Sequence, residues 1–242
     1  MRPHLPGADG DALPRWRPPG QCAVCRSWDG AALCRWCVQR FAAPVARCSR
    51  CGLRTATPTE MCGACLQDPP PFDGCVVALD YAFPWDRLIA DFKFDGQVEL
   101  AAPLAARLLD AILMARQPLP DWVLPVPLGP RRLAERGYNQ AWELARRVAR
   151  GLGRRADARL LERPLDGPQQ AGLDLARRRR NLRGAYVLDL SRRLSLQGRH
   201  VALVDDVMTS GATLREAAAA LRRGGVSRVD AWALARTPAP GE

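Results

Sequence analysis

Histidine and lysine are almost absent from this sequence of 242 residues. The only histidines are His4 and His200, and Lys93 is the single lysine. Neither histidine lies in a pattern typical of a catalytic acid or base, so a mechanism centred on imidazole is disfavoured. Positive charge is instead carried almost entirely by arginine.

Long apolar runs are also missing. A membrane-spanning helix needs about 18 apolar residues, and the best candidate, 100–115, is interrupted by Arg107 and Asp110. The first twenty residues are rich in proline and glycine and hold no apolar segment of the kind a secretory signal requires. The sequence therefore predicts a cytoplasmic protein without a membrane span. A hydrophobic content of 48% excludes wholesale disorder.

The net charge of +11 is concentrated in one segment. Residues 131–193 contain 17 basic and 7 acidic side chains. Such a local positive field attracts phosphates, diphosphates or nucleic acid. The alternative is a solvated arginine-rich surface in a chain that uses arginine where others use lysine.

Cysteine is absent after Cys75, and the eight cysteines before it form four Cys-x-x-Cys pairs. A two-residue spacer lets two thiolates from one turn bind the same tetrahedral metal ion, which predicts two structural Zn(II) sites. Pairing of neighbours gives the shorter loops and is favoured, and an iron–sulfur cluster is the competing interpretation. Cys75 lies in an apolar run and is predicted to be a core residue. The predicted metal ligands are Cys22, Cys25, Cys34, Cys37, Cys48, Cys51, Cys62 and Cys65.

Composition divides the chain into three parts. Residues 1–20 are predicted to be a flexible leader, 21–68 a double zinc ribbon, and 72–238 an α/β domain that follows a run of three prolines. Within the last part, strands are expected at 75–81, 122–126, 159–163, 186–190, 201–204 and 228–234. Helices are expected at 86–94, 98–116, 139–152 and 212–223, with a basic helical stretch ending near 183. This alternation predicts a parallel sheet with helices on both faces and a ligand site at the carboxyl ends of the strands.

The most informative segment is 201–214. An apolar strand is followed by Asp205 and Asp206, and then by a small, hydroxyl-rich turn that opens a helix. Backbone N–H groups at a helix N-terminus favour a phosphate, whereas adjacent carboxylates suit sugar hydroxyls or hydrated Mg²⁺. The order predicts a site for a ribose 5-phosphate group. The alternative is a buried strand followed by an acidic helix cap.

This segment resembles the phosphoribosyl pyrophosphate (PRPP) motif of type I phosphoribosyltransferases. Segments 125–140 and 170–186, together with the double zinc ribbon, further resemble the ComF family, which includes amidophosphoribosyltransferase-like competence proteins. The resemblance covers about residues 20–237. It implies the type I phosphoribosyltransferase fold, a twisted parallel sheet flanked by helices. Ala171 and Arg177 depart from that family's commoner Thr and Glu.

The resemblance also implies roles for individual residues. Asp205 and Asp206 would hold the ribose hydroxyls and Mg²⁺ in the catalytic site. The predicted 5-phosphate loop comprises Thr209, Ser210, Gly211, Ala212 and Thr213. The predicted diphosphate-side residues are Arg131, Arg136, Asn139 and, on a basic lid, Arg178 and Arg179.

Three functions fit these features. The first is a phosphoribosyltransferase that transfers its group to an unidentified acceptor and releases pyrophosphate, with a link to DNA uptake in natural transformation. The second is a PRPP- or nucleotide-binding adaptor for single-stranded DNA or for a helicase and other competence proteins. The third is a regulator that retains the fold without catalysis. PRPP binding is common to all three.

Overall fold

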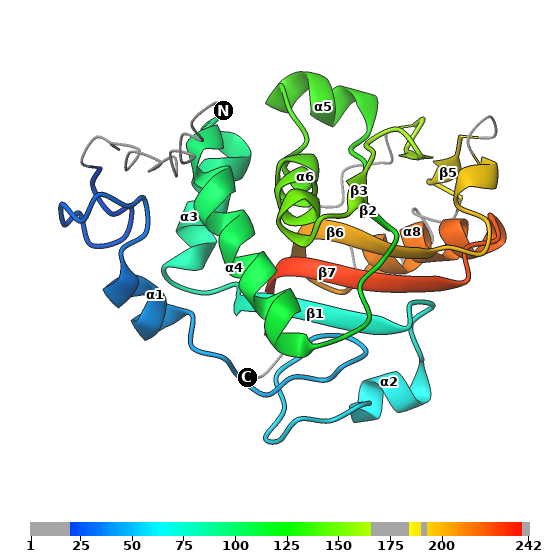
Figure 1. The fold of residues 1–242 in the computed structure, drawn as a ribbon, viewed down its shortest axis with the longest axis horizontal. Helices are drawn as coiled ribbons and strands as arrows, with labels where there is room; N and C mark the ends of the chain where they lie inside the picture. The colour runs from blue at the N-terminus through cyan, green and yellow to red at the C-terminus, as the bar shows by residue number, and fades with distance from the viewer. Residues whose placement is uncertain (1–19, 166–183, 190–192, 239–242) are drawn as a thin grey trace, which may run out of the picture.

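The structure is a computed structural model, and it describes residues 20–165, 184–189 and 193–238. Arg178 and Arg179, with the rest of the predicted basic lid, lie outside the described residues. A twisted sheet crosses the centre of the molecule, with helices packed on it (Figure 1). Among the described helices, none is both long and apolar enough to cross a bilayer.

The central sheet has five strands in the order β1-β7-β6-β2-β3, and every neighbouring pair is parallel. This arrangement confirms the predicted parallel sheet. The strands are β1 (Gly74–Asp80), β2 (Trp122–Pro125), β3 (Arg155–Ala156), β6 (His200–Met208) and β7 (Arg228–Arg236).

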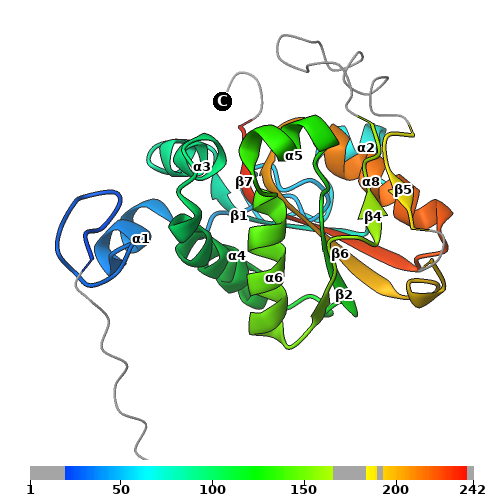
Figure 2. The same ribbon diagram turned by 90° about the horizontal axis from the view of Figure 1, so that it is seen from above.

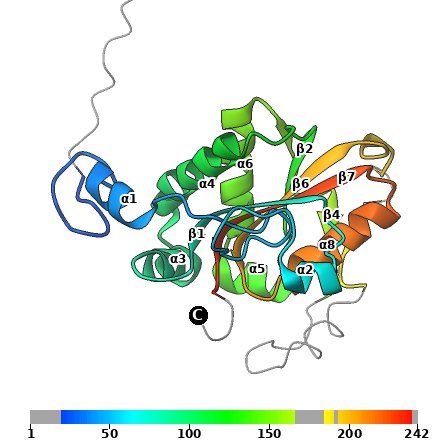
Figure 3. The ribbon, with the colours of Figure 1, turned by 90° about the horizontal axis from the view of Figure 1, so that it is seen from below.

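Helices cover both faces, as predicted (Figures 2 and 3). On one side lie α3 (Trp85–Phe94), α4 (Ala101–Ala115) and α6 (Gln140–Leu152), and on the other lies α8 (Ala212–Arg223). Alternate residues of β6 serve the two sides, since Val201 and Leu203 join the α8 cluster whereas Ala202 and Val204 join the α4–α6 cluster. A central parallel strand is buried on both faces, which explains its continuous apolar run.

Several elements differ from the prediction. The strand expected at 201–204 continues as β6 to Met208, because β7 pairs with it over its whole length. The strands expected at 159–163 and 186–190 are shortened to β4 (Leu161–Glu162) and β5 (Val187–Leu188). They pair antiparallel with each other, outside the main sheet. The expected helix 98–116 begins as the 3₁₀ turn η1 (Val98–Leu100) before α4. A second 3₁₀ turn, η2 (Arg193–Ser195), precedes β6.

The two cysteine groups attach at different places. The first cysteine group (Cys22, Cys25, Cys34, Cys37) includes the start of α1 (Arg35–Phe41), and the second cysteine group (Cys48, Cys51, Cys62, Cys65) includes the start of α2 (Gly63–Gln67). The first lies beside α3, where Trp85 Nε1 donates to the Phe41 carbonyl at 2.7 Å. The second lies against β1, whose Cys75 N–H donates to the Ser49 carbonyl at 2.7 Å. Figure 3 shows α1 beside α3 and α2 beside α8.

Candidate functional site

A cavity of about 470 Å³ opens at the carboxyl edge of the sheet, beside β2 and β6. The connections leave these neighbouring strands in opposite directions across the sheet. From β2 the chain passes through α6 to β3 on one side, and from β6 it passes through α8 to β7 on the other. Such a switch point leaves a crevice beyond the strand ends, and open α/β sheets bind their ligands there. The cavity therefore lies where the sequence predicted the site.

Two adjacent carboxylates line the cavity. Asp205 and Asp206 follow directly after Val204, the last residue of β6 that pairs with β2. The Nζ atom of Lys93, which comes from α3, lies 2.9 Å from Asp206 Oδ1. Lys93 thus compensates the charge of Asp206, which lies beside a second carboxyl group on the same buried strand.

The electrostatics of the pair favour a cation. Burial, reinforced by the neighbouring charge of Asp206, raises the pKa of Asp205 to about 8. Asp206 is itself buried, and its Oδ2 atom has no hydrogen-bond partner among the described residues. Carboxylate oxygens are the ligands that Mg²⁺ prefers, so this pair fits that ion.

The predicted phosphate loop follows β6. Gly211 adopts a φ of +74°, the left-handed conformation that suits glycine, and the Ala212 N–H lies 3.3 Å from Ser210 Oγ. Thr213, in the first turn of α8, lines the site cavity. Ser210 and Gly211 instead line a smaller cavity of about 280 Å³ on the side of Cys51 and Cys65. The loop therefore lies between the candidate site and the second cysteine group.

Arginines reach the cavity from α5 (Pro130–Arg136), a helix that the sequence analysis did not predict. Arg132 and Arg136 line the cavity, and the Arg136 guanidinium lies 5.0 Å from the ring centroid of the exposed Phe94. Arg131 is not part of the lining, and its Nε instead donates to Glu135 at 2.7 Å.

Asn139 holds the start of α6 in place through hydrogen bonds. Its Oδ1 accepts from the Ala141 N–H at 2.9 Å and caps α6, while its Nδ2 donates to the Val126 carbonyl at 3.1 Å. Asn139 does not line the cavity. Contact of Arg131 or Asn139 with PRPP stays a prediction.

The polar lining residues that were not predicted include Lys93, Gln140, Arg163 and Tyr186. Arg163 and Tyr186 come from beside the short strands β4 and β5, and their side chains stack at 5.8 Å. Burial raises the pKa of the Tyr186 hydroxyl to about 12, so it remains a protonated donor. The available signals were that Lys93 is the chain's single lysine and that Gln140 and Tyr186 end the segments 125–140 and 170–186, which resemble the ComF family.

Unpaired polar atoms gather at this cavity. Among the described residues, seven buried side-chain N or O atoms have no hydrogen-bond partner. Four of the seven belong to cavity-lining residues: Gln140 Oε1, Arg163 Nε, Tyr186 Oη and Asp206 Oδ2. Buried polar atoms are rarely left unpaired, so their clustering indicates a polar ligand.

The cysteines form two tetrads of neighbouring pairs, which confirms the favoured pairing. In each tetrad all four sulfur atoms lie within 4.8 Å of one another. The sulfurs of Cys25 and Cys34 are 3.7 Å apart, and those of Cys51 and Cys62 are 3.6 Å apart. Regular tetrahedral coordination with Zn–S bonds of about 2.3 Å places the sulfur atoms about 3.8 Å apart. Each of the two groups therefore fits one zinc ion of its own. Cys75 is buried in the core, as predicted.

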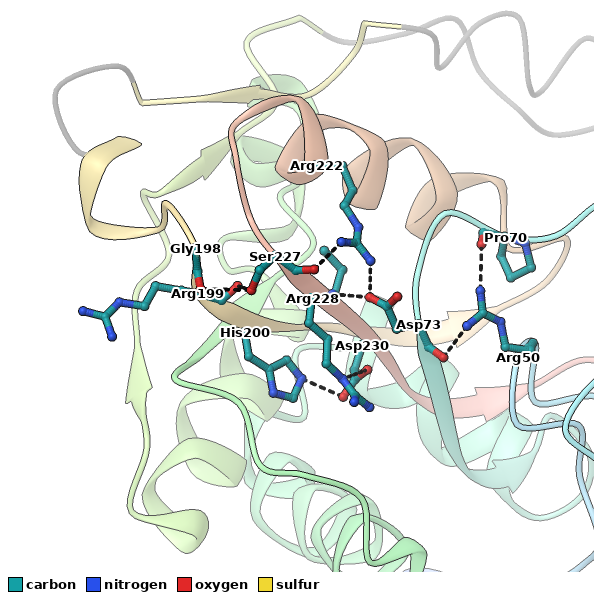
Figure 4. A network of polar contacts seen from close by, with 11 residues as sticks. Arg50, Pro70, Asp73, Gly198, Arg199, His200, Arg222, Ser227, Arg228 and Asp230 are labelled. Carbon is teal, nitrogen blue, oxygen red and sulfur yellow. Dashed lines mark hydrogen bonds and ion pairs between the residues drawn. The ribbon is translucent and has the colours of Figure 1, made fainter.

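His200 lies at the opposite edge of the sheet. Its Nε2 is 2.8 Å from Asp230 Oδ2, and Arg228 Nε donates to the other oxygen of Asp230 at 3.2 Å. Figure 4 shows this network together with the Arg222–Asp73 pair at the amino ends of β6 and β7. Because His200 begins β6 and Asp205 lies in the carboxyl half of that strand, where the cavity opens, His200 takes no part in the site.

Comparisons with known proteins agree with this geometry. The profile of the phosphoribosyl transferase domain family matches residues 138–242. The chain is 38% identical over 226 residues to the DNA utilization protein YhgH of Salmonella typhi, covering 90% of this chain and 98% of that protein. It is 37% identical over 193 residues to Competence protein F of Haemophilus influenzae, covering 78% of this chain and 84% of that protein.

Among solved structures, the glutamine PRPP amidotransferase of B. subtilis matches 60% of this chain and 30% of its own, at 17% identity and a TM-score of 0.40. The same family is indicated by the structure and by the relatives. The structure has the parallel sheet, the acid pair at its switch point and the two cysteine tetrads, and the long matches are to YhgH and Competence protein F. The chain belongs to the ComF family, with a phosphoribosyltransferase fold and two four-cysteine groups that fit a double zinc ribbon.

Proposed function

We propose that this chain binds PRPP together with Mg²⁺ at the Asp205–Asp206 cavity and transfers the phosphoribosyl group to an acceptor, with release of pyrophosphate. Two of its relatives are named for DNA utilization and for competence, and the proposal places the reaction in that context. The observation that carries the proposal is the cluster of four unpaired buried polar atoms around one cavity beside the acid pair.

The cavity and the loop beside it suit the parts of PRPP. The acid pair would accept hydrogen bonds from the ribose hydroxyls, and the loop 209–213, of which Thr213 lines the cavity, would hold the 5-phosphate with its N–H groups. Arg132 and Arg136 lie on the side of the cavity formed by α5, where a diphosphate would find compensating charge. Mg²⁺, when bound, would neutralise part of the charge of the leaving diphosphate.

The reaction makes few demands on acid–base chemistry. The acceptor forms a bond to the anomeric carbon while the bond to pyrophosphate breaks, through a transition state of oxocarbenium character. The chain's own contribution is to orient the groups and to stabilise the leaving charge. This is consistent with a site built from carboxylates and arginines and without histidine. In the ribbons, Zn(II) would be structural, because each tetrad fills all four ligand positions.

Calorimetry with PRPP and Mg²⁺ tests the proposal. The wild type is expected to bind, and Asp205→Asn/Asp206→Asn is expected to bind at least about tenfold more weakly, since charge-assisted hydrogen bonds are lost. Asp121→Asn is the matched control, because Asp121 accepts from the His200 N–H at the other end of β6. Equal heats for the wild type and the double variant would refute the proposal.

A second function is favoured by a separate observation. Trp28 and Trp36, in the first cysteine group's segment, are 69% and 65% exposed, and the Arg35 guanidinium lies 4.9 Å from the Trp36 ring. Exposed aromatics beside arginine suit the bases of single-stranded nucleic acid. Salt-dependent fluorescence anisotropy with single-stranded DNA tests this adaptor role. Unchanged binding by Trp28→Ala/Trp36→Ala would count against it.

A further inference from the structure

Arg236 joins the second cysteine group to the predicted phosphate loop. It is the last residue of β7, and it is only 8% exposed. Its Nε donates to the Cys51 carbonyl at 3.2 Å. Its Nη1 lies 3.1 Å from the Met208 carbonyl oxygen and also contacts the Thr209 carbonyl. A single buried guanidinium thus contacts a turn of the second cysteine group, the last residue of β6 and the first residue of the loop.

A second arginine makes a similar link after the loop. Arg215, in the first turns of α8, donates from Nη2 to the Asp68 carbonyl at 2.6 Å and from Nη1 to the Pro69 carbonyl at 3.2 Å. Asp68 directly follows α2 of the second cysteine group. The loop is therefore tied to this group on both sides.

The contacts of Arg236 constrain the orientation of the loop's peptide groups. In a trans peptide the C=O and the following N–H point to opposite sides. Because the carbonyls of Met208 and Thr209 face Arg236, the N–H groups of Thr209 and Ser210 point away from it. These N–H groups belong to the loop that is predicted to bind phosphate.

We propose that Arg236 is a positioning residue that fixes the phosphate loop on the second cysteine group, so that metal binding there sets the loop's affinity for a 5-phosphate. This inference rests on the proposed function. The second cysteine group would then be part of the phosphate-binding apparatus, and not only an appended module.

The first cysteine group provides an internal control. It contacts α3 through Phe41 and Trp85, and among the described residues no hydrogen bond joins it to residues 208–213. Cys25→Ser/Cys34→Ser removes two ligands of the first group, and Cys51→Ser/Cys62→Ser removes the corresponding two of the second. Atomic emission would verify that each variant has lost one metal ion per chain.

The test uses two ligands that engage different parts of the site. Ribose 5-phosphate requires the loop and the acid pair, whereas inorganic pyrophosphate with Mg²⁺ requires the acid pair and the arginines of α5. For Arg236→Gln and for Cys51→Ser/Cys62→Ser we expect ribose 5-phosphate affinity to fall about tenfold. Pyrophosphate affinity should stay within about twofold of wild type. Arg236→Lys should be intermediate, and Cys25→Ser/Cys34→Ser should leave both affinities unchanged.

The outcomes separate the two proposals. A wild type that binds neither ligand overturns the proposed function. Wild-type binding with unchanged ribose 5-phosphate affinity in the Arg236 and second-group variants overturns only the role of Arg236. An equal loss of affinity for both ligands also overturns the role of Arg236, because that pattern reflects general damage to the fold. If the Arg236 variants fail to fold, as judged by circular dichroism, the comparison of the two cysteine double variants decides.

Discussion

The Nζ atom of Lys93 lies 2.9 Å from Oδ1 of Asp206, so the chain's single lysine is paired with the candidate catalytic carboxylates. Removing one partner of a largely buried ion pair leaves the other charge uncompensated and costs about 3 kcal/mol or more. We expect Lys93→Met to lower the melting temperature of the ligand-free protein by roughly 5–10 °C, with partial recovery in millimolar Mg²⁺.

Lys93→Arg, which keeps the charge, should lose less stability than Lys93→Met. Arg87→Met on the exposed side of the same helix is the matched control and should change the melting temperature little. A Lys93→Met protein as stable as wild type without Mg²⁺ would contradict this assignment. Differential scanning calorimetry with and without Mg²⁺ makes the measurement.

Asp80 connects β1 to the second cysteine group. It accepts from Arg47 Nη2 at 2.8 Å and from Arg54 Nε at 2.6 Å. Burial alone would raise the pKa of Asp80, but these two arginines outweigh it and hold the pKa below its ordinary value. A double-mutant cycle of Asp80→Asn and Arg47→Met should give a coupling energy of about 1–2 kcal/mol by urea unfolding at pH 7.

The pH dependence of that coupling follows from the sign of the pKa shift. A carboxyl with a lowered folded-state pKa contributes its stability fully above its unfolded pKa of about 3.9 and loses it as the pH falls below that value. The coupling should therefore be the same at pH 5.5 and pH 7.5. A coupling energy near zero, or one that halves between these two pH values, would show that the contacts do not hold the group.

Gly52 brings the second cysteine group close against the sheet. Its φ is +70°, and a Cβ atom there would lie 2.2 Å from Val77 Cγ2. Gly52→Ala should cost about 1–2 kcal/mol for the left-handed conformation, with a further loss from the contact with Val77. Gly30→Ala, at φ +68° with no atom within 4 Å, should cost only the conformational part. Urea titrations that show equal losses for the two variants would contradict this packing.

The two cysteine tetrads predict the metal content. Freshly purified protein should contain two zinc ions per chain by atomic emission, because each tetrad supplies four thiolates and no more. Chelation under mildly denaturing conditions should unfold both groups, since metal binding is the main source of folding energy in such small units. Iron with visible absorption would support the cluster interpretation, and a metal content near zero would refute both.

The parts of the fold that could be predicted are those in which the local pattern of apolar residues shows which side chains are buried. Residues Val201 to Val204 form a continuous apolar run because β6 is covered on both faces, and the regular apolar spacing of α6 gives one buried side. The helix α5 was missed because none of its seven residues is buried, so it carries no apolar periodicity. The two-residue strand β3 is likewise too short to show a pattern.

Apart from Arg136, the residues of the cavity that were predicted are those of one contiguous segment. Asp205 and Asp206 lie on β6 and the loop directly follows that strand, so their order in the chain reproduces their order in space. Lys93 and Tyr186 reach the cavity from segments more than ninety residues apart, brought together by packing that no local pattern records. Arg236 was missed for a similar reason, because its partners Cys51 and Thr209 belong to two different parts of the chain.

The scarcity of lysine means that the site can be labelled selectively. Apart from the terminal amine, an acylating reagent directed at primary amines finds only Lys93 in this sequence. Because that amine is paired with Asp206 and its side chain is only 16% exposed, its rate of labelling reports how open the cavity is and how firmly the ion pair is formed. A single mass shift, followed over time with each candidate ligand, would therefore measure occupancy of the acid pair without any knowledge of the acceptor.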